Sequence, residues 1–237
     1  SKWIFYLISF VLLLFLAIGI YKFRDGFLYY LGFKTDKNVE TLSKEERKLA
    51  DIRIYEVLHK HDDKAIGFDV SEYQSEIDWE QTYHIDESFE LSFVFIRATA
   101  GKNKVDSRFK ENWKASKERE LIRGAYHYYR PNENSIEQAE NFIKTVKLQK
   151  GDLPPVLDIE KLPKSQSIDS LKVGLRRWLN KVEKHYKVKP IIYSGESYYT
   201  DFLKEEFSDY PLWIANYNFW RNHLEDDWLF WHFTEKA

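Results

Sequence analysis

Cysteine and methionine are both absent from the 237 residues of this sequence. Without cysteine, the chain forms no disulfide, holds no metal through thiolates and has no cysteine nucleophile. Because not even position 1 is methionine, we expect that the sequence does not start at the initiator residue and is incomplete.

An excess of basic residues is also missing, because 36 Lys and Arg residues stand against 38 Asp and Glu residues. A formal net charge of −2 gives no reason to expect a nucleic-acid partner, since no basic surface is available to release counterions. Glycine-rich phosphate loops, internal repeats and low-complexity segments are absent as well. Aromatic residues, in contrast, make up 17% of the chain, enough for stacking surfaces as well as a large core.

One long apolar run, residues 3–21, contains no charged residue. It is long enough to cross a hydrocarbon layer of roughly 30 Å as a helix, and Trp3 and Tyr21 suit the aromatic belts at the two interfaces. The alternative is a cleaved signal peptide, which has a shorter apolar core followed by a small-x-small cleavage site. Residues 16–20 match such a site poorly, so we predict a transmembrane anchor over residues 1–21.

The next segment, residues 22–64, is predicted to be a juxtamembrane stalk. Ser43 followed by Glu46 forms a capping-box pattern, and apolar residues then recur at helical spacing, which predicts a helix over residues 43–61. The two histidines near its end stand two positions apart. Residues so spaced do not share a helix face, which favours a polar linker over a metal site.

From Ala65 onward, short apolar runs alternate with longer amphipathic segments, a pattern typical of βα units. Strands are predicted at residues 66–70, 93–99, 124–129, 156–159, 191–194, 212–215 and 229–233. Helices are predicted between them at residues 106–119, 135–146 and 167–185. Because the connections shorten after His185, we expect an α/β fold over residues 65–237, a modified TIM-like barrel that begins as βα and ends as mostly β.

Two acidic residues, Asp158 and Glu160, end the strand predicted at residues 156–159. Side chains alternate along a strand, so the two carboxyl groups point to the same side. Like charges this close raise one pKa and oppose folding, and they occur where acid–base chemistry needs one protonated and one ionised carboxyl group. Taken alone, the pair is equally compatible with a strand end that a loop leaves in solvent.

Polar and aromatic residues also stand at the C-terminal ends of the other predicted strands, on the face where βα barrels build their sites. They include Asp69, Ser71, Tyr126, His127, Tyr128, Arg130, Tyr193, Trp213, Asn216, Tyr217, Trp231 and His232. Aromatic rings stack on sugar faces and carboxylates cleave glycosidic bonds, so this combination indicates a sugar cleft. Each aromatic residue taken singly is also compatible with core packing.

Several of these segments resemble motifs of the glycoside hydrolase family 25 lysozymes. The similar segments, in the family's order, are GFDVSEYQ at 67–74, IDW at 77–79, FVFIRATAG at 93–101, GAYHY at 124–128, DIE at 158–160, YS at 193–194, WIANY at 213–217 and WHF at 231–233. Each motif is short, but their joint occurrence is specific. The chain is therefore identified as a member of this family from about residue 66 to its end.

The resemblance implies a (β/α)5(β)3 barrel with N-acetylmuramidase activity, which hydrolyses the β-1,4 bond between N-acetylmuramic acid and N-acetylglucosamine in peptidoglycan without metal or cofactor. It implies that Glu160 is the general acid/base, that Asp158 assists by orienting the substrate's acetamido group, and that Asp69 is the third carboxylate. The side chains that it implies along the cleft are Tyr126, His127, Tyr128, Arg97, Tyr193, Trp213, Tyr217 and Trp231. The two anionic neighbours are expected to raise the pKa of Glu160, so that it stays protonated near neutral pH.

The sequence departs from the family pattern in three places. Arg97 and Ala100 stand where members often carry Lys and Glu; the arginine keeps the charge but changes the geometry, and the alanine removes a carboxylate. His232 stands at the position of a glutamine, and the usual last strand, with its glycine-rich turn and site aspartate, does not appear before Ala237. We therefore expect a fragment whose barrel lacks the last strand and has an open edge.

The predicted function is that of a monomeric, membrane-anchored muramidase that acts on peptidoglycan glycan strands in the periplasm or outside the cell. One alternative is a catalytically weak peptidoglycan-binding module that keeps the cleft but lacks the last strand. A chitinase-like barrel of another family is a second alternative, although that family carries further acids ahead of its catalytic glutamate, where this chain has Val156. Direct displacement, a covalent intermediate and substrate assistance all stay open, because they depend on carboxylate separations.

Overall fold

The computed structural model of the protein describes residues 3, 6–7, 9–11, 13–15, 44–82, 84–85, 88–218 and 221–235. Most of the predicted anchor, and the predicted stalk up to residue 43, lie outside these residues. No helix within the described ranges has both the length and the apolar character that crossing a membrane requires. The chain divides into two compact units, Ser1–Ala50 and Asp51–Ala237, and the second contains the sheet.

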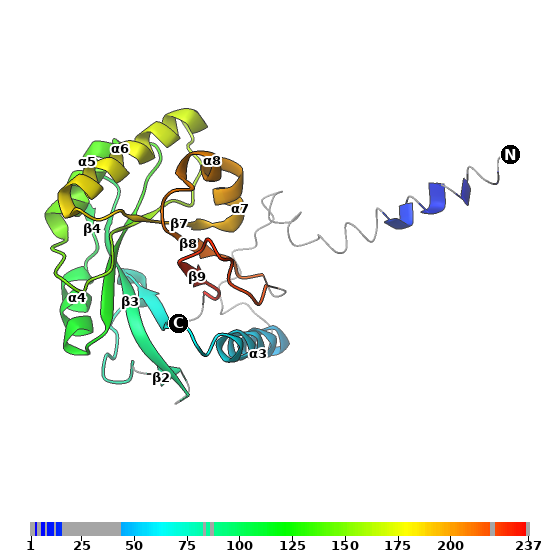
Figure 1. Ribbon diagram of the computed structural model, residues 1–237, viewed down its shortest axis with the longest axis horizontal. Coiled ribbons are helices and arrows are strands. Elements are labelled where there is room, and N and C mark those ends of the chain that lie inside the picture. Colours follow the sequence, from blue (N-terminus) through cyan, green and yellow to red (C-terminus); the bar gives the residue numbers. More distant parts are fainter. Residues whose placement is uncertain are drawn as a thin grey trace. The chain divides into compact units, whose positions relative to one another are not determined.

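A curled sheet of parallel strands forms a half-barrel in the second unit (Figure 1). Its path runs through β1 (Ile66–Val70), β3 (Phe89–Ala100), β5 (Ile122–Tyr128), β6 (Val156–Asp158), β7 (Ile191–Gly195), β8 (Leu212–Ala215) and β9 (Phe230–His232). All seven predicted strands are present in this path. Two further strands, β2 (His84–Ile85) and β4 (Lys104–Val105), pair antiparallel with β3 and are too short to show a sequence pattern. Within the described residues β1 and β9 do not pair with each other, so the sheet is open between them.

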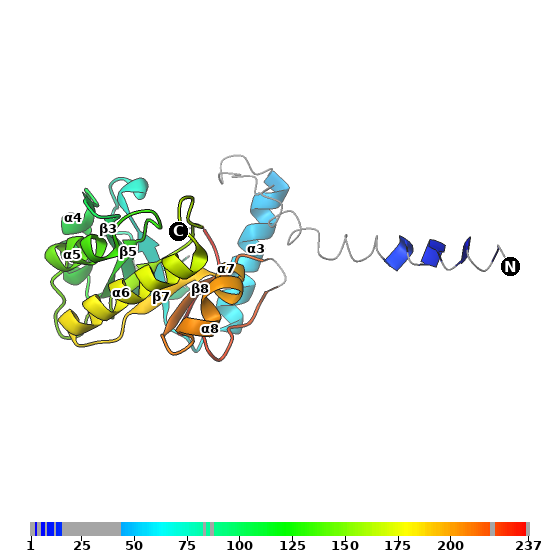
Figure 2. The ribbon, with the colours of Figure 1, turned by 90° about the horizontal axis from the view of Figure 1, so that it is seen from above.

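Helices cover the outer face of this sheet, and α5 (Ser135–Thr145) and α6 (Ile168–Tyr186) lie side by side on it (Figures 1 and 2). The side chain of Asn134 caps α5 by accepting hydrogen bonds from the backbone N–H groups of Ile136 and Glu137. The inner face of α6 is apolar at helical spacing and fully packed, through Leu171, Leu175, Trp178, Leu179 and Val182. The predicted helices therefore form where the spacing of apolar residues and the capping residues both indicate a helix.

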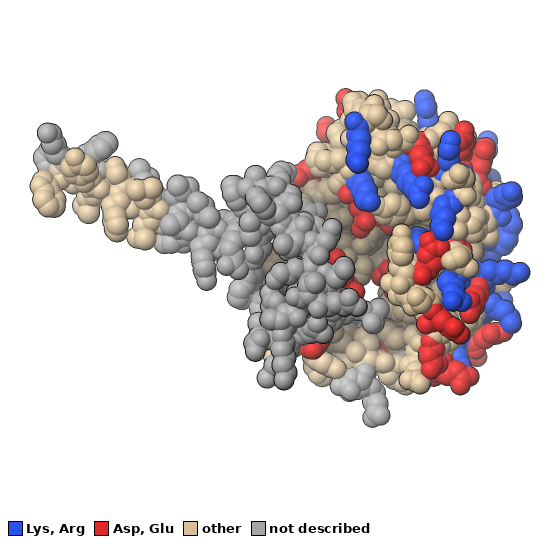
Figure 3. Space-filling model, turned by 180° about the vertical axis from the view of Figure 1, so that it is seen from behind, with Lys and Arg blue, Asp and Glu red and all other residues tan. Residues whose placement is uncertain are grey.

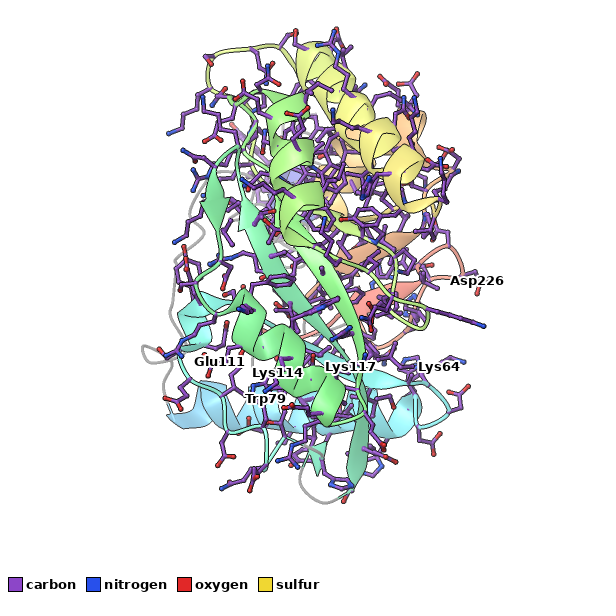
Figure 4. All side chains as sticks on the ribbon, turned by 90° about the vertical axis from the view of Figure 1, so that its left-hand side faces the viewer. Lys64, Trp79, Glu111, Lys114, Lys117 and Asp226 are labelled. Carbon is purple, nitrogen blue, oxygen red and sulfur yellow. The ribbon has the colours of Figure 1, made fainter. Side chains whose placement is uncertain are left out.

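Shorter helical elements complete the fold. The third outer helix is α4 (Phe109–Glu118), and its exposed face carries Glu111, Lys114 and Lys117 (Figure 4). The connection between β7 and β8 consists of α7 (Glu196–Tyr198), the π-helical turn η3 (Tyr199–Leu203) and α8 (Lys204–Phe207). A 3-10 turn, η2 (Glu72–Gln74), follows β1 and is held by a capping box between Ser71 and Gln74.

Alternation along the strands divides the core into two clusters. The outer cluster lies between sheet and helices, and includes Val94, Ile96, Leu157, Trp178 and Ile214. The inner cluster lines the concave side of the sheet, with Phe95, Tyr126, Val156, Ile191, Tyr193 and Trp213. On β3, Phe93 and Phe95 thus point inward and Val94, Ile96 and Ala98 point to the helices, as the two-residue period of a strand requires. A register shift between Arg97 and Thr99 then brings Thr99 to the helix side.

The segment ahead of β1 is not only a stalk. Helix α3 (Lys44–Lys60) matches the helix expected over residues 43–61. From Asp51 on it belongs to the same compact unit as the sheet, and Val57 and Leu58 are only 2% exposed. The compact unit therefore starts earlier than the predicted boundary at residue 65, because apolar side chains of α3 are buried in it.

Positive and negative side chains are interspersed on the face of the second unit that Figure 3 shows. Exposed charges of the second unit also pair, such as Lys181 with Glu140 and Lys189 with Asp209, both at 2.8 Å. Exposed pairs of this kind add little stability, about 0–1 kcal/mol each. This face is therefore a solvated surface without a patch of one sign.

Two glycines on the inner face allow phenylalanine rings to fill the half-barrel. A Cβ atom at Gly67 would lie 2.5 Å from the backbone oxygen of Phe93, and one at Gly124 would lie 2.4 Å from the ring of Phe95. Real Cβ atoms do not approach other atoms so closely. Each phenylalanine ring on β3 therefore fills the space that a glycine leaves on the neighbouring strand.

We predict that Gly124→Ala destabilises the protein by about 1–3 kcal/mol, because the added methyl group overpacks the inner cluster. Urea unfolding measures the change. The double variant Gly124→Ala with Phe95→Leu is expected to lose less stability than the sum of the two single variants, since the smaller side chain removes the clash. Strict additivity would contradict this account of the glycine.

Candidate functional site

Three carboxyl groups come together at the C-terminal edge of the sheet, on its concave side. Asp69 lies near the end of β1, Asp158 ends β6, and Glu160 follows two residues later. Asp158 is 6% exposed, the side chain of Asp69 is 29% exposed, and Glu160 is exposed. Asp69 and Glu160 are both near enough to act electrostatically on Asp158.

Asp158 is the carboxyl group that this arrangement disfavours most as an anion. Burial raises its pKa well above the ordinary value, and the charges of Glu160 and Asp69 raise it further. Its Oδ1 atom is buried and has no hydrogen-bond partner among the residues that the structure describes. Burial raises the pKa of Asp69 as well. The raised pKa that the sequence predicts for Glu160 stays a prediction, and the structure raises the pKa of Asp158, the more deeply buried member of the pair.

A histidine joins Asp69 to two tyrosines. His232 Nε2 lies 3.4 Å from Asp69 Oδ1, while its Nδ1 lies 3.0 Å from the hydroxyl of Tyr193 and 3.1 Å from that of Tyr217. Both tyrosine hydroxyls lie within hydrogen-bond distance of Nδ1, and Nε2 is the ring nitrogen that faces the carboxyl group of Asp69. The array connects the end of β1 with β7, β9 and the segment that follows β8.

An aromatic wall surrounds the carboxyl groups. Tyr193 packs on Trp213 with ring centroids 4.5 Å apart, and Trp213 in turn stacks on Phe95 at 4.3 Å. Tyr126 stands edge-on to Trp213 at 6.5 Å. Burial, together with the charges of Asp69 and Asp158, raises the pKa of Tyr126 well above its ordinary value, so its hydroxyl stays a hydrogen-bond donor. Most of this wall is part of the packed interior, and its upper rim is open at Tyr217, which is 36% exposed.

Arg97 supplies positive charge to the site from below. Its guanidinium lies 2.8 Å from Asp106 and 3.0 Å from Glu72, and it is almost fully buried. Its charge acts on Asp158 and on Tyr126, opposing the rise of both pKa values. Arg97 is therefore held by two acidic partners, Glu72 in η2 and Asp106 directly after β4, and its charge acts on the site through space.

Two of the residues predicted along the cleft face the other side of the sheet. His127 is fully buried under the helices, with Nδ1 2.7 Å from Thr99 Oγ1 and Nε2 3.1 Å from Gln138 Oε1, and it stacks on Trp178. Trp231 donates from Nε1 to the backbone oxygen of Asn216 and packs against the outer cluster. Both alternate with Tyr126, Tyr128, Phe230 and His232, which take the inner positions, and their contact with substrate stays a prediction.

Two residues of the site were absent from the predicted set. His232 stood among the polar residues at the strand ends but not among the cleft side chains that the resemblance implies, yet it lies between Asp69 and the tyrosines. Tyr73 is 79% exposed, and its ring covers the guanidinium of Arg97 at 4.5 Å. For His232, the alternation with Trp231 was the available signal. For Tyr73, which lies in the 3-10 turn η2, the sequence carried no such signal.

A cavity of about 930 Å³ opens beside Asp69, where the sheet is unpaired between β1 and β9; Asp158 and Glu160 are not among its lining residues. Asp69 and His232 line one part of it, the apolar side chains of Phe93 and Phe230 another, and α3 a third. No group of three or more potential metal ligands occurs in the described part of the chain. The arrangement can exchange protons through carboxyl groups, in a partly dry cleft with aromatic walls.

Comparison with known proteins relates this geometry to one family. The sequence profile of the glycosyl hydrolases family 25 matches residues 68–237. The protein YegX of Escherichia coli K12 is 40% identical over 175 residues, which are 72% of this chain and 63% of YegX. Lysozyme M1 of Streptomyces globisporus is 31% identical over 183 residues, which are 71% of this chain and 61% of that lysozyme. The chain thus spans less than two thirds of the length of either relative.

Solved structures give the same result. A family 25 glycosyl hydrolase from Bacillus anthracis superimposes with a TM-score of 0.64 at 30% identity, over 72% of this chain and 79% of that chain. A muramidase from Trichobolus zukalii superimposes with a TM-score of 0.63 at 25% identity, over 73% of this chain and 89% of that chain.

The buried position of His127 predicts a pH dependence of stability. Burial lowers its pKa to about 3, so the unfolded chain takes up a proton at a pH where the folded protein does not. The stabilisation is complete above the ordinary pKa of histidine, about 6.5, and is lost as the pH falls towards 3, by up to about 1.4 kcal/mol per pH unit.

Urea unfolding of His127→Leu between pH 7 and pH 4 is expected to show a flatter dependence on pH than the parent, although the variant is less stable at pH 7. His223→Leu is the matched control, since His223 has a side chain that is 56% exposed. Equal slopes for the parent and His127→Leu would refute the assignment of His127 as a buried neutral residue.

Proposed function

Because the chain belongs to the glycosyl hydrolases family 25, we propose that it is a peptidoglycan hydrolase of the lysozyme type. The bond cleaved is the β-1,4 bond between N-acetylmuramic acid and N-acetylglucosamine. The observation that carries the proposal is the convergence of Asp69, Asp158 and Glu160 inside an aromatic wall at the C-terminal edge of the sheet. Such a set combines the acid–base groups and the stacking surfaces that glycoside hydrolysis needs.

Glu160 is the general acid/base in this proposal, and Asp158 assists. Glu160 is exposed at the end of β6 and can reach a bound glycan, whereas Asp158 lies buried beside it. The two groups interact, so they titrate as a pair that shares a proton. The proton must be on Glu160 when the glycosidic oxygen leaves, and Glu160 then draws a proton from the incoming water.

The unpartnered Oδ1 atom of Asp158 supports its assisting role. A buried carboxyl oxygen without a partner is costly, and a substrate N–H group would satisfy it. In this proposal, the acetamido N–H group of the sugar donates a hydrogen bond to Oδ1 of Asp158. With the shared proton on Glu160, Asp158 is an anion and accepts that hydrogen bond more strongly.

Substrate contacts come from the inner side of the strands. Tyr126, Tyr128, Tyr193, Trp213 and Tyr217 line the wall, and the exposed ring of Tyr73 extends it outward. Peptidoglycan lies outside the cytoplasm, so the catalytic unit acts in the periplasm or outside the cell. The transmembrane anchor over residues 1–21 and the monomeric state remain part of the proposal as expectations from the sequence.

The substitution Glu160→Gln removes the proton donor and keeps the shape. We predict that it lowers the rate of muropeptide release from purified peptidoglycan by roughly 10²–10⁴-fold. Mass spectrometry measures the cleavage by detecting released muropeptides that have reducing muramic acid ends. Glu111→Gln is the matched control, because Glu111 is exposed on the outer helix α4 (Figure 4).

Equal release by the parent and Glu160→Gln would remove Glu160 from the mechanism. Sedimentation with peptidoglycan but no cleavage by the parent would favour a binding module.

The interaction between Asp158 and Glu160 predicts a shift in the pH profile. Each charge raises the pKa of the other group, so Asp158→Asn lowers the pKa at which the remaining acid loses its proton. The basic limb of the rate profile is therefore expected to move to lower pH, by about one unit or more, while the rate at the optimum also falls. A profile recorded from pH 4 to pH 9 checks the shift. An unchanged basic limb would show that Asp158 does not interact with the proton donor.

A further inference from the structure

Arg53 of α3 is a buried cation that reaches across the fold. It is 6% exposed, and burial lowers the pKa of its guanidinium. Its Nε donates to the backbone oxygen of Asn218 at 3.2 Å, its Nη2 to that of Arg221 at 3.4 Å, and its Nη1 to that of Phe233. These acceptors belong to two segments more than 160 residues away in the sequence. One planar fork thus connects three carbonyl groups.

The acceptors adjoin the two residues that meet in the site. Asn218 follows Tyr217, and Phe233 follows His232. The hydroxyl of Tyr217 lies 3.1 Å from Nδ1 of His232, so Arg53 holds the backbone next to both members of this contact. A movement of either segment would separate the pair and release His232 from Asp69.

Arg53 supports β9 at the edge of the sheet where this strand has no strand neighbour. Within the described residues β9 pairs with β8 alone, and its other edge faces the cavity between β1 and α3. The guanidinium also lies over the ring of Trp231, 5.8 Å from its centroid. Near the end of α3, Lys60 and His61 contact Asn222 at 2.9 Å and 3.1 Å. A three-residue strand with one partner needs such contacts to keep its position.

We propose that Arg53 is a positioning residue of the site, through which α3 holds Tyr217 and His232 in register with Asp69. This inference rests on the proposed function for its consequence on catalysis. Helix α3, which precedes the residues that the family profile matches, then contributes to catalysis. The role requires the planar fork, since a single ammonium group cannot reach both segments at once.

Kinetics of the full chain on soluble peptidoglycan fragments test the catalytic consequence. Arg53→Ala is expected to lower kcat roughly 10- to 100-fold with KM within about twofold, because a displacement near 1 Å at the reacting groups has effects of this size. Arg53→Lys keeps the charge and is expected to stay reduced about tenfold. Arg177→Ala is the matched control, since Arg177 is exposed on α6. Full activity of Arg53→Lys or Arg53→Ala would overturn the proposal.

Nitrogen NMR of the histidine rings tests positioning without any turnover. The chain has 7 histidines, and His232→Gln identifies the signal of His232 by its loss. In Arg53→Ala and Arg53→Lys, the Nδ1 and Nε2 shifts of His232 are expected to move towards those of a free imidazole, while Arg177→Ala leaves them in place. If the parent cleaves no peptidoglycan, the proposed function fails, but the NMR result still decides the role of Arg53. Parent-like His232 shifts in a folded Arg53→Lys variant would overturn it.

Discussion

Alternation of side chains along parallel strands is the constraint on which the rest of the structure depends. Each strand packs against the helices with one face and lines the interior of the half-barrel with the other. Only every second residue is therefore available for each role. On β5 this rule gives Tyr126 and Tyr128 to the interior and His127 to the helices. On β9 it gives His232 to the site and Trp231 to the outer packing. The same rule brings Asp158 and Glu160 to one side of β6.

The carboxyl cluster is the part of the fold with the greatest electrostatic cost. Asp158 is buried next to Asp69 and Glu160, one of its oxygens has no partner, and its pKa is raised as a result. A sequence selected only for stability would not keep such a group, because an apolar residue of similar size would remove the cost. The arrangement accords with a site whose polar groups are completed by a ligand.

Support for this cluster comes from outside the strands as well as from within them. Asp106 and Glu72 hold Arg97 beneath the cluster, and His232 connects Asp69 to Tyr193. At the open edge of the sheet, where β9 has a strand neighbour on one side only, a helix takes part in the support. The positions of the reacting groups therefore depend on contacts between segments that are far apart in the sequence.

The sequence by itself determined the strands, the three outer helices and the acidic pair at residues 158 and 160, because each of these depends on the period of apolar residues or on neighbouring positions. It also identified the family, since short motifs recur in a characteristic order. The tertiary structure decided which face each aromatic residue takes, as Tyr126 and His127 illustrate. It decided that Asp158 is the most buried of the three carboxyl groups and has a raised pKa, because burial depends on every element around it. It decided too that Arg53 joins the site, because hydrogen bonds between residues 53 and 233 have no trace in a local pattern.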